Sequence, residues 1–129
     1  MLVSIDFDGT MWSHMAFFRA LMIGLQTQGH QVGCLTGHAA ETEAADVRLM
    51  MSRGFPAPNF YFGRTPEFIP LNGAHFKLTM IEKHRIAMHF DDFDYNNPET
   101  RRIFDASPLR GRIIKVEHRE PTSTHFEMW

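Results

Sequence analysis

Short apolar runs alternate with stretches of helical periodicity along the whole chain. The runs predict five strands, at residues 2–6, 31–35, 60–62, 86–90 and 113–116. After the first run, Met15, Phe18, Met22 and Leu25 recur at helical spacing, and Gly29 is placed to end that helix. The opening third of the chain therefore predicts a strand, a helix and a second strand.

Three further helices follow from similar patterns. They are marked by Ala44, Val47 and Met51, by Phe76, Met80 and Ile81, and by the capping sequence Asn97-Pro98-Glu99. Residues 63–75 carry Pro66, Pro70 and Gly73, and we expect an irregular surface loop there. Five strands that alternate with four helices predict an α/β fold, a Rossmann-like three-layer sandwich around a mostly parallel five-stranded sheet.

Composition narrows the class of protein. The 129 residues suffice for one domain, which we place at residues 1–116, followed by a polar tail at 117–129. The formal charge of −2 argues against holding nucleic acid by bulk electrostatics. The lone cysteine, Cys34, excludes an internal disulfide, and we expect it to pack in the core. With no secretory signal and no apolar run of membrane-spanning length, we expect a cytoplasmic protein without membrane contact.

Polar residues gather where the predicted strands end. The ends and the segments next to them supply four groups: Asp6 and Asp8; Thr36, Gly37 and His38; Lys77; and Asp91 and Asp92, with Asp94 and Asn96 close behind. Ligands of doubly wound sheets bind at the carboxyl ends of the strands, so these side chains should share one edge. Carboxylate oxygens suit magnesium, and a hydroxyl and an ammonium suit a phosphoryl group.

These motifs resemble those of the haloacid dehalogenase-like superfamily of phosphohydrolases. Its first motif, an apolar strand followed by D-x-D-G-T, matches Ile5 to Thr10, and its second matches Leu35-Thr36-Gly37. Its third is a lysine at a helix start, here Lys77, and its fourth is an apolar strand ending in paired acids, here Met88 to Asp92. The resemblance spans residues 2–116, with the four motifs in the order of the family.

The resemblance implies a magnesium-dependent phosphomonoester hydrolase that works through an aspartyl-phosphate intermediate. Asp6 would be the nucleophile, and Asp8 would protonate the leaving oxygen and later activate water. Thr36 and Lys77 would bind the phosphoryl group. Magnesium would be held by the Asp6 carboxylate, the main-chain carbonyl of Asp8, and one or both of Asp91 and Asp92. Many relatives run directly from the paired acids into Asn-Pro-Glu, whereas here residues 93–96 intervene. This leaves open which of Asp91 and Asp92 contacts the metal.

Simpler interpretations stand beside several of these roles. Lys77 could be a solvated helix residue, and Thr36 could cap a helix or satisfy a turn. His38 could contact substrate, and His14 is a weaker candidate for the same role. Asp94 and Asn96 are either surface loop residues or ligands that reach the metal through water.

The gaps between the motifs are too short for a cap domain. Capless members of the family often act on macromolecules or borrow a neighbouring subunit, so we expect a macromolecular phosphorylated substrate or a homodimer. Residues 63–75 or the end of the tail, residues 126–129, would supply the contact. Two alternatives remain: a nucleotidase or nucleic-acid-end phosphatase, and a non-catalytic phosphate-binding or regulatory module on the same fold.

Overall fold

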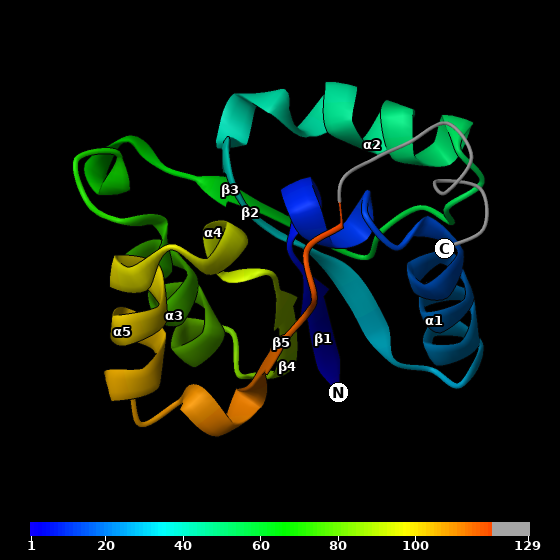
Figure 1. Ribbon diagram of the computed structural model, residues 1–129. Helices are drawn as coiled ribbons and strands as arrows, with labels where there is room; N and C mark the ends of the chain where they lie inside the picture. The colour runs from blue at the N-terminus through cyan, green and yellow to red at the C-terminus, as the bar shows by residue number, and fades with distance from the viewer. Residues whose placement is uncertain (120–129) are drawn as a thin grey trace.

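The computed structural model describes residues 1–119 and shows the predicted α/β sandwich (Figure 1). All five predicted strands are present: β1 (Leu2–Ile5), β2 (Gln31–Ala39), β3 (Tyr61–Arg64), β4 (Ile86–Asp91) and β5 (Ile113–Lys115). They form one sheet in the order β3-β2-β1-β4-β5, and every neighbouring pair is parallel. The strand order reverses between β1 and β4, which makes the carboxyl ends of these two strands the expected ligand site.

Helices cover both faces of the sheet (Figure 1). The five helical segments are α1 (Met15–Thr27), α2 (Glu43–Ser52), α3 (Gly73–Lys83), α4 (Phe93–Asn96) and α5 (Pro98–Ala106). On one face, α1 and α2 bury Met22 and Met50 against Val3 of β1. On the other face, Phe76 of α3 packs in one apolar cluster with β2 and β4, and Phe104 of α5 packs in a second. Burial on both faces is what allows a parallel sheet to persist.

Strand register brings the acidic residues together. Ile5 of β1 lies opposite both Cys34 of β2 and Phe90 of β4. The amide of Asp6 continues this pairing and donates to the carbonyl of Phe90 at 2.9 Å. The residues that follow β1 and β4 must therefore emerge side by side at the same edge of the sheet.

Two boundaries differ from the sequence prediction near the site. The third helix begins at Gly73, one turn before Lys77, because the Asn72 side chain accepts a hydrogen bond from the Ala74 amide and caps the helix there. Residues 63–75 are also not wholly irregular, since β3 runs to Arg64 and a short 3₁₀ turn spans Pro66–Phe68.

The helix marked by Ala44, Val47 and Met51 is present as α2, but Met51 is not the methionine that it buries. Met51 is 52% exposed, and its neighbour Met50 is buried against Cys34 instead. The charged residues of this ten-residue helix leave a weak apolar pattern, so the sequence gives its existence more clearly than its orientation.

The segment α4 is a left-handed turn. All four of its residues have positive φ angles, between 50° and 65°, although none is glycine. Phe93 is buried against Phe104, with ring centroids 5.0 Å apart, and the Thr100 hydroxyl donates to Asp94 at 2.8 Å. These contacts oppose the cost of the left-handed conformation, which is about 1–3 kcal/mol per residue. They also fix the segment that separates the paired acids from Asn97.

The chain after β5 returns to the edge where the acids lie. The Ser13 hydroxyl donates to the carbonyl of Arg119 at 2.9 Å, so residues 117–119 run beside the turn that follows β1. The predicted contact of residues 126–129 with a partner subunit or substrate lies outside the described residues. Within residues 1–119, no helix is long and apolar enough to cross a membrane.

Candidate functional site

Three buried aspartates meet at the carboxyl ends of β1 and β4. Asp6, Asp91 and Asp92 each offer a carboxylate oxygen, and these atoms lie within 4.8 Å of one another. All three residues are at most 5% exposed. Three oxygen ligands at this spacing fit a small divalent cation such as magnesium, which prefers carboxylate oxygens.

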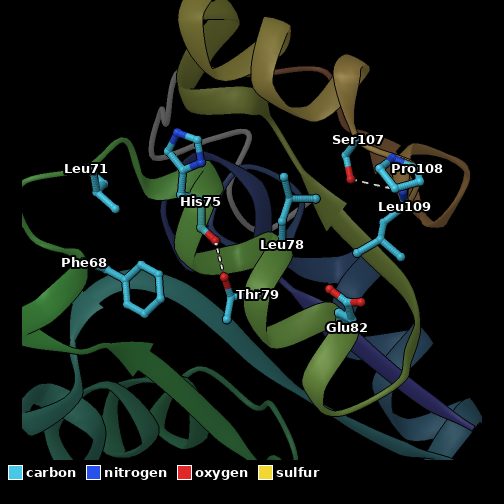
Figure 2. Close-up of a pocket in the computed structure, with 9 residues that line it drawn as sticks. All are labelled: Phe68, Leu71, His75, Leu78, Thr79, Glu82, Ser107, Pro108 and Leu109. Carbon is cyan, nitrogen blue, oxygen red and sulfur yellow. Dashed lines mark hydrogen bonds between the residues drawn. The ribbon is translucent and has the colours of Figure 1, made fainter.

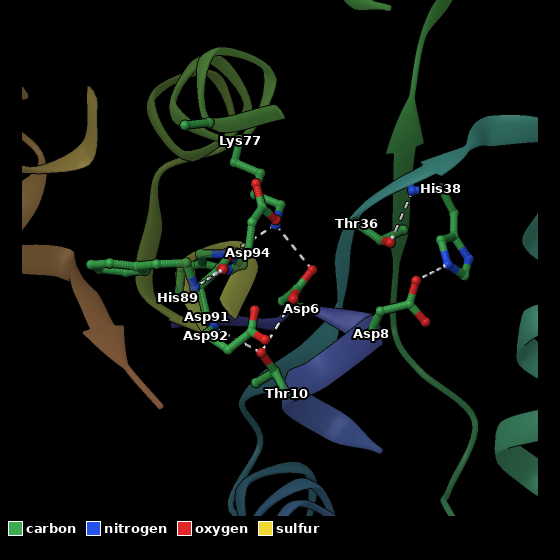
Figure 3. Close-up of polar contacts among 12 residues, drawn as sticks. Asp6, Asp8, Thr10, Thr36, His38, Lys77, His89, Asp91, Asp92 and Asp94 are labelled. Carbon is green, nitrogen blue, oxygen red and sulfur yellow. Dashed lines mark hydrogen bonds and ion pairs between the residues drawn. The ribbon is translucent and has the colours of Figure 1, made fainter. Parts of the chain in front are cut away.

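Lys77 joins this cluster from α3 (Figure 3). Its Nζ lies 3.0 Å from Asp6 Oδ1 and 2.7 Å from Asp91 Oδ2, and its side chain is 5% exposed. Burial alone would lower the pKa of Lys77, but the charges of Asp6 and Asp91 outweigh it and raise that pKa. Lys77 is thus a buried ammonium held by two carboxylates, not a solvated helix residue.

The pKa values of the two carboxylates that share Lys77 shift in opposite directions. Burial, followed by the negative charge of Asp91, raises the pKa of Asp6 well above its ordinary value, although Lys77 opposes the shift. Burial would also raise the pKa of Asp91, but the Lys77 ammonium and a hydrogen bond from His89 lower it. The stable ion pair is therefore Lys77 with Asp91. Asp6 is the carboxylate that an added cation would help to keep ionised.

A buried histidine supports Asp91 from within the sheet. His89 Nε2 lies 2.7 Å from Asp91 Oδ2, and His89 Nδ1 lies 2.8 Å from the hydroxyl of Ser4 on β1. Burial lowers the pKa of His89, so the neutral ring donates from Nε2 to Asp91 and accepts from Ser4 at Nδ1. Sequence analysis missed this role, although His89 precedes Asp91 by two residues and so lies on the same face of β4.

Asp92 is the better candidate of the paired acids for direct metal contact. It lines the pocket described below, whereas Asp91 does not. Both Asp91 oxygens are already engaged, Oδ2 by Lys77 and His89 and Oδ1 by the Phe93 amide at 2.8 Å. Burial raises the pKa of Asp92, and His118 Nδ1 contacts its Oδ2 at 3.1 Å.

The turn after β1 explains why glycine and threonine follow Asp8. Thr10 is fully buried, and its hydroxyl donates to Asp6 Oδ2 at 3.2 Å while accepting from the Asp92 amide at 2.9 Å. Gly9 has a φ of +71°, and a Cβ at this position would lie 2.1 Å from Asp92 Oδ2. The D-G-T sequence therefore ties the ends of β1 and β4 together, with no room for a side chain at Gly9.

Asp8 lies apart from the three clustered aspartates. Its side chain is 73% exposed and turns toward His38, whose Nε2 is 2.5 Å from Asp8 Oδ2 (Figure 3). His38 Nδ1 also lies 2.9 Å from Asp46 Oδ2. An ionised carboxylate only accepts hydrogen bonds, so the ring is the donor in each contact where the carboxyl group is ionised, and a protonated Asp8 would instead donate to Nε2. Burial lowers the pKa of His38, but the hydrogen bonds from its ring to Asp46 and Asp8 raise it overall.

A pocket of about 350 Å³ opens between the cluster and Asp8. Every residue of the predicted catalytic and substrate-binding set lines it: Asp6, Asp8, Thr36, Gly37, His38 and Lys77. The Thr36 oxygen accepts from the His38 amide at 3.1 Å, which leaves its hydroxyl proton free to donate. Asp94 lines the pocket as well, whereas His14 does not; its ring contacts the carbonyl of Glu117 at 2.6 Å.

Arg64 is a pocket residue that sequence analysis did not single out. Its Nε and Nη2 donate to the carbonyl of Phe68 at 3.2 and 2.9 Å, which braces the segment that leads into α3. Only its place at the end of a strand could have drawn attention to it.

Asn96, which was considered as a water-mediated metal ligand, instead bonds to Lys115 and does not line the pocket.

A second hollow, of about 470 Å³, lies beside α3 (Figure 2). Its walls are mainly apolar, with one carboxylate, and none of its residues belongs to the four motifs: Phe68, Leu71, His75, Leu78, Thr79, Glu82, Ser107, Pro108 and Leu109. The convergence of acids, ammonium and hydroxyl marks the edge at β1 and β4 as the candidate site.

Comparison of the chain with known protein families, curated proteins and solved structures finds no match. The chemistry of the site is therefore judged on its own residues. Asp6 and Asp91 share the Lys77 ammonium, Asp92 contacts His118, and the pocket beside them is lined by the side chains of Thr36 and His38. Such an arrangement can bind a divalent cation and a phosphoryl group together.

Proposed function

We propose that this protein is a magnesium-dependent phosphomonoester hydrolase of the haloacid dehalogenase-like type, with Asp6 as its nucleophile. The observation that carries the proposal is the meeting of Asp6, Asp91, Asp92 and Lys77 at the strand-order switch point. A structural ion pair needs one carboxylate for one ammonium. Here two buried carboxylates share one ammonium, and a third, Asp92, brings its oxygen within 4.8 Å of theirs, which favours a site that receives a cation.

Asp6 is the best placed of the three acids to attack phosphorus. It lines the pocket, and Thr10 and Lys77 fix its two oxygens. Asp91 is fully buried and does not line the pocket, so it serves to anchor Lys77. In-line attack by an Asp6 oxygen would form an aspartyl-phosphate and release the alcohol, and water would then release phosphate and restore the carboxylate.

The surrounding groups suit the other roles. Lys77 and the Thr36 hydroxyl would offset the negative charge of the phosphoryl oxygens. Asp8, across the pocket from the cluster, would give a proton to the leaving oxygen and later take one from water. Asp6, Asp92 and the Asp8 carbonyl would hold magnesium. When bound, the cation would neutralise charge and polarise the phosphoryl group.

Hydrolysis of an aryl phosphate tests the proposal. We expect wild-type protein to be active with Mg²⁺ and inactive in excess chelator, and Asp6→Asn to be inactive in both. Asp105→Asn is the matched control, because Asp105 is an exposed carboxylate on α5 outside the pocket. Full turnover in chelator, or by Asp6→Asn, would refute the mechanism. Phosphate binding without turnover would favour a non-catalytic binding module.

A further inference from the structure

A row of three side chains crosses the rim of the pocket opposite the metal-type cluster. Asp46 of α2 contacts His38 Nδ1 at 2.9 Å, and His38 Nε2 contacts Asp8 at 2.5 Å. The three residues come from α2, from β2 and from the turn after β1. Neither Asp46 nor His38 belongs to the four motifs that predicted the site.

The outer end of this row is held firmly. The Tyr61 hydroxyl donates to Asp46 Oδ2, and this same oxygen accepts from His38. The Thr42 hydroxyl lies 3.1 Å from it and shares its one proton with the carbonyl of Ala39 at 2.8 Å. The Asp46 side chain is 13% exposed, against 30% for His38. These contacts on one shielded oxygen fix the carboxylate, and the carboxylate in turn fixes the plane of the imidazole.

The inner end of the row is the Asp8 carboxylate, and among residues 1–119 the side chain that the structure gives it as a partner is His38. The Asp8 side chain is 73% exposed. An exposed aspartate without a partner samples several rotamers, whereas proton transfer to a leaving oxygen needs one of them.

We propose that His38, held by Asp46, is a positioning residue that fixes the Asp8 carboxyl group where the leaving oxygen of the substrate emerges. The inference rests on the proposed hydrolase function and deepens it. His38 and Asp46 do not contact the phosphorus; they act through Asp8.

The leaving group of the substrate provides the test. An alkyl alkoxide is a poor leaving group and needs a proton from Asp8, whereas p-nitrophenolate leaves without one. We expect His38→Ala and Asp46→Asn to lower kcat/KM for an alkyl phosphate by about 10–100-fold, the cost of misplacing a catalytic group. On p-nitrophenyl phosphate the loss should stay below about threefold, because acid catalysis contributes little there.

Three further variants separate positioning from general damage. His38→Gln should recover much of the alkyl phosphate activity, because its amide can donate to Asp8 from the place of Nε2. Tyr61→Phe, which removes one donor from Asp46, should give a smaller loss of the same kind. His75→Ala, at an exposed histidine outside the pocket, should change neither activity.

A double variant tests whether His38 acts through Asp8. In an Asp8→Asn background, His38→Ala should have no further effect on the alkyl substrate.

The possible outcomes are distinct. Equal losses on both substrates, or no loss on the alkyl phosphate, would overturn the positioning role alone. A wild-type protein that hydrolyses neither ester would refute the proposed function, and this inference with it. If His38→Ala does not fold, as judged by circular dichroism, Asp46→Asn and Tyr61→Phe decide the question on the same criteria.

Discussion

Replacing Lys77 with methionine should destabilise the protein strongly. The Lys77 ammonium makes contacts of 3.0 and 2.7 Å with two carboxylates, and both ends of each pair are almost fully buried. Methionine fills similar space but leaves Asp6 and Asp91 without a counter-charge. Removing one partner of a buried ion pair typically costs about 3–5 kcal/mol. Domains of this size have a free energy of unfolding of about 5–15 kcal/mol, so the loss would be a large share of the total.

Urea unfolding followed by circular dichroism, in the presence of chelator, measures this loss. Lys83→Met is the matched control, because Lys83 is exposed on the same helix, and it should change stability by less than about 0.5 kcal/mol. Adding Mg²⁺ should stabilise Lys77→Met more than wild type, since the cation would then be the main counter-charge to the three acids. A loss below about 1 kcal/mol for Lys77→Met would refute the view of Lys77 as the charge that holds the cluster together.

Three further predictions concern other parts of the structure. In a thermal-unfolding assay, Gly9→Ala should lower the free energy of unfolding by at least about 1–3 kcal/mol, because of the positive φ of Gly9 and the contact with Asp92. Gly24→Ala is the control: it lies in a helix with open space around its Cβ, and it should raise the free energy of unfolding by about 0.5–1 kcal/mol. Burial raises the pKa of Asp46, but hydrogen bonds from its neighbours lower it below its ordinary 3.8, so ionised Asp46 stabilises the fold. The stability deficit of Asp46→Asn should therefore be full near about pH 5 and shrink as the pH falls below 3.8. It should also shrink at higher pH as His38, whose pKa Asp46 raises, loses its proton; a deficit independent of pH would exclude this charge effect. Burial raises the pKa of the Cys34 thiol to about 12, so a thiol reagent should modify native protein only at the rate of unfolding, and rapid modification without denaturant would contradict that burial.

The sequence was sufficient for the parts of this fold that periodicity and caps determine. The five strands lie near their predicted positions, and Asn97 caps α5 as expected by accepting from the amides of Glu99 and Thr100. These features depend on neighbours in the chain. The face of α2 depends on tertiary packing that a weak apolar pattern does not reveal, and so Met50 rather than Met51 is buried.

The same distinction holds for the candidate site, where some residues could be placed from the sequence and others depend on tertiary packing. Asp6, Thr36 and Asp92 could be placed at one edge because topology alone brings strand ends together. Lys77 lies in α3, and its place in the third motif is what pointed to it. The partnership of His38 with Asp46 could not be predicted, since it depends on how α2 rotates over the end of β2. The positive φ angles across Phe93–Asn96 were equally hidden, because none of those residues is glycine.

The central claim is that Asp6 is the nucleophile, and the most direct test is to identify which residue becomes phosphorylated during turnover. Protein incubated with Mg²⁺ and an aryl phosphate is quenched in acid during turnover, digested and mapped by mass spectrometry. The Asp8→Asn variant is tested alongside, because it should slow breakdown of the intermediate and let it accumulate. We predict phosphate on Asp6, sensitive to hydroxylamine and absent from Asp6→Asn. Phosphate retained by Asp6→Asn, or mapped to any other residue, would contradict the account.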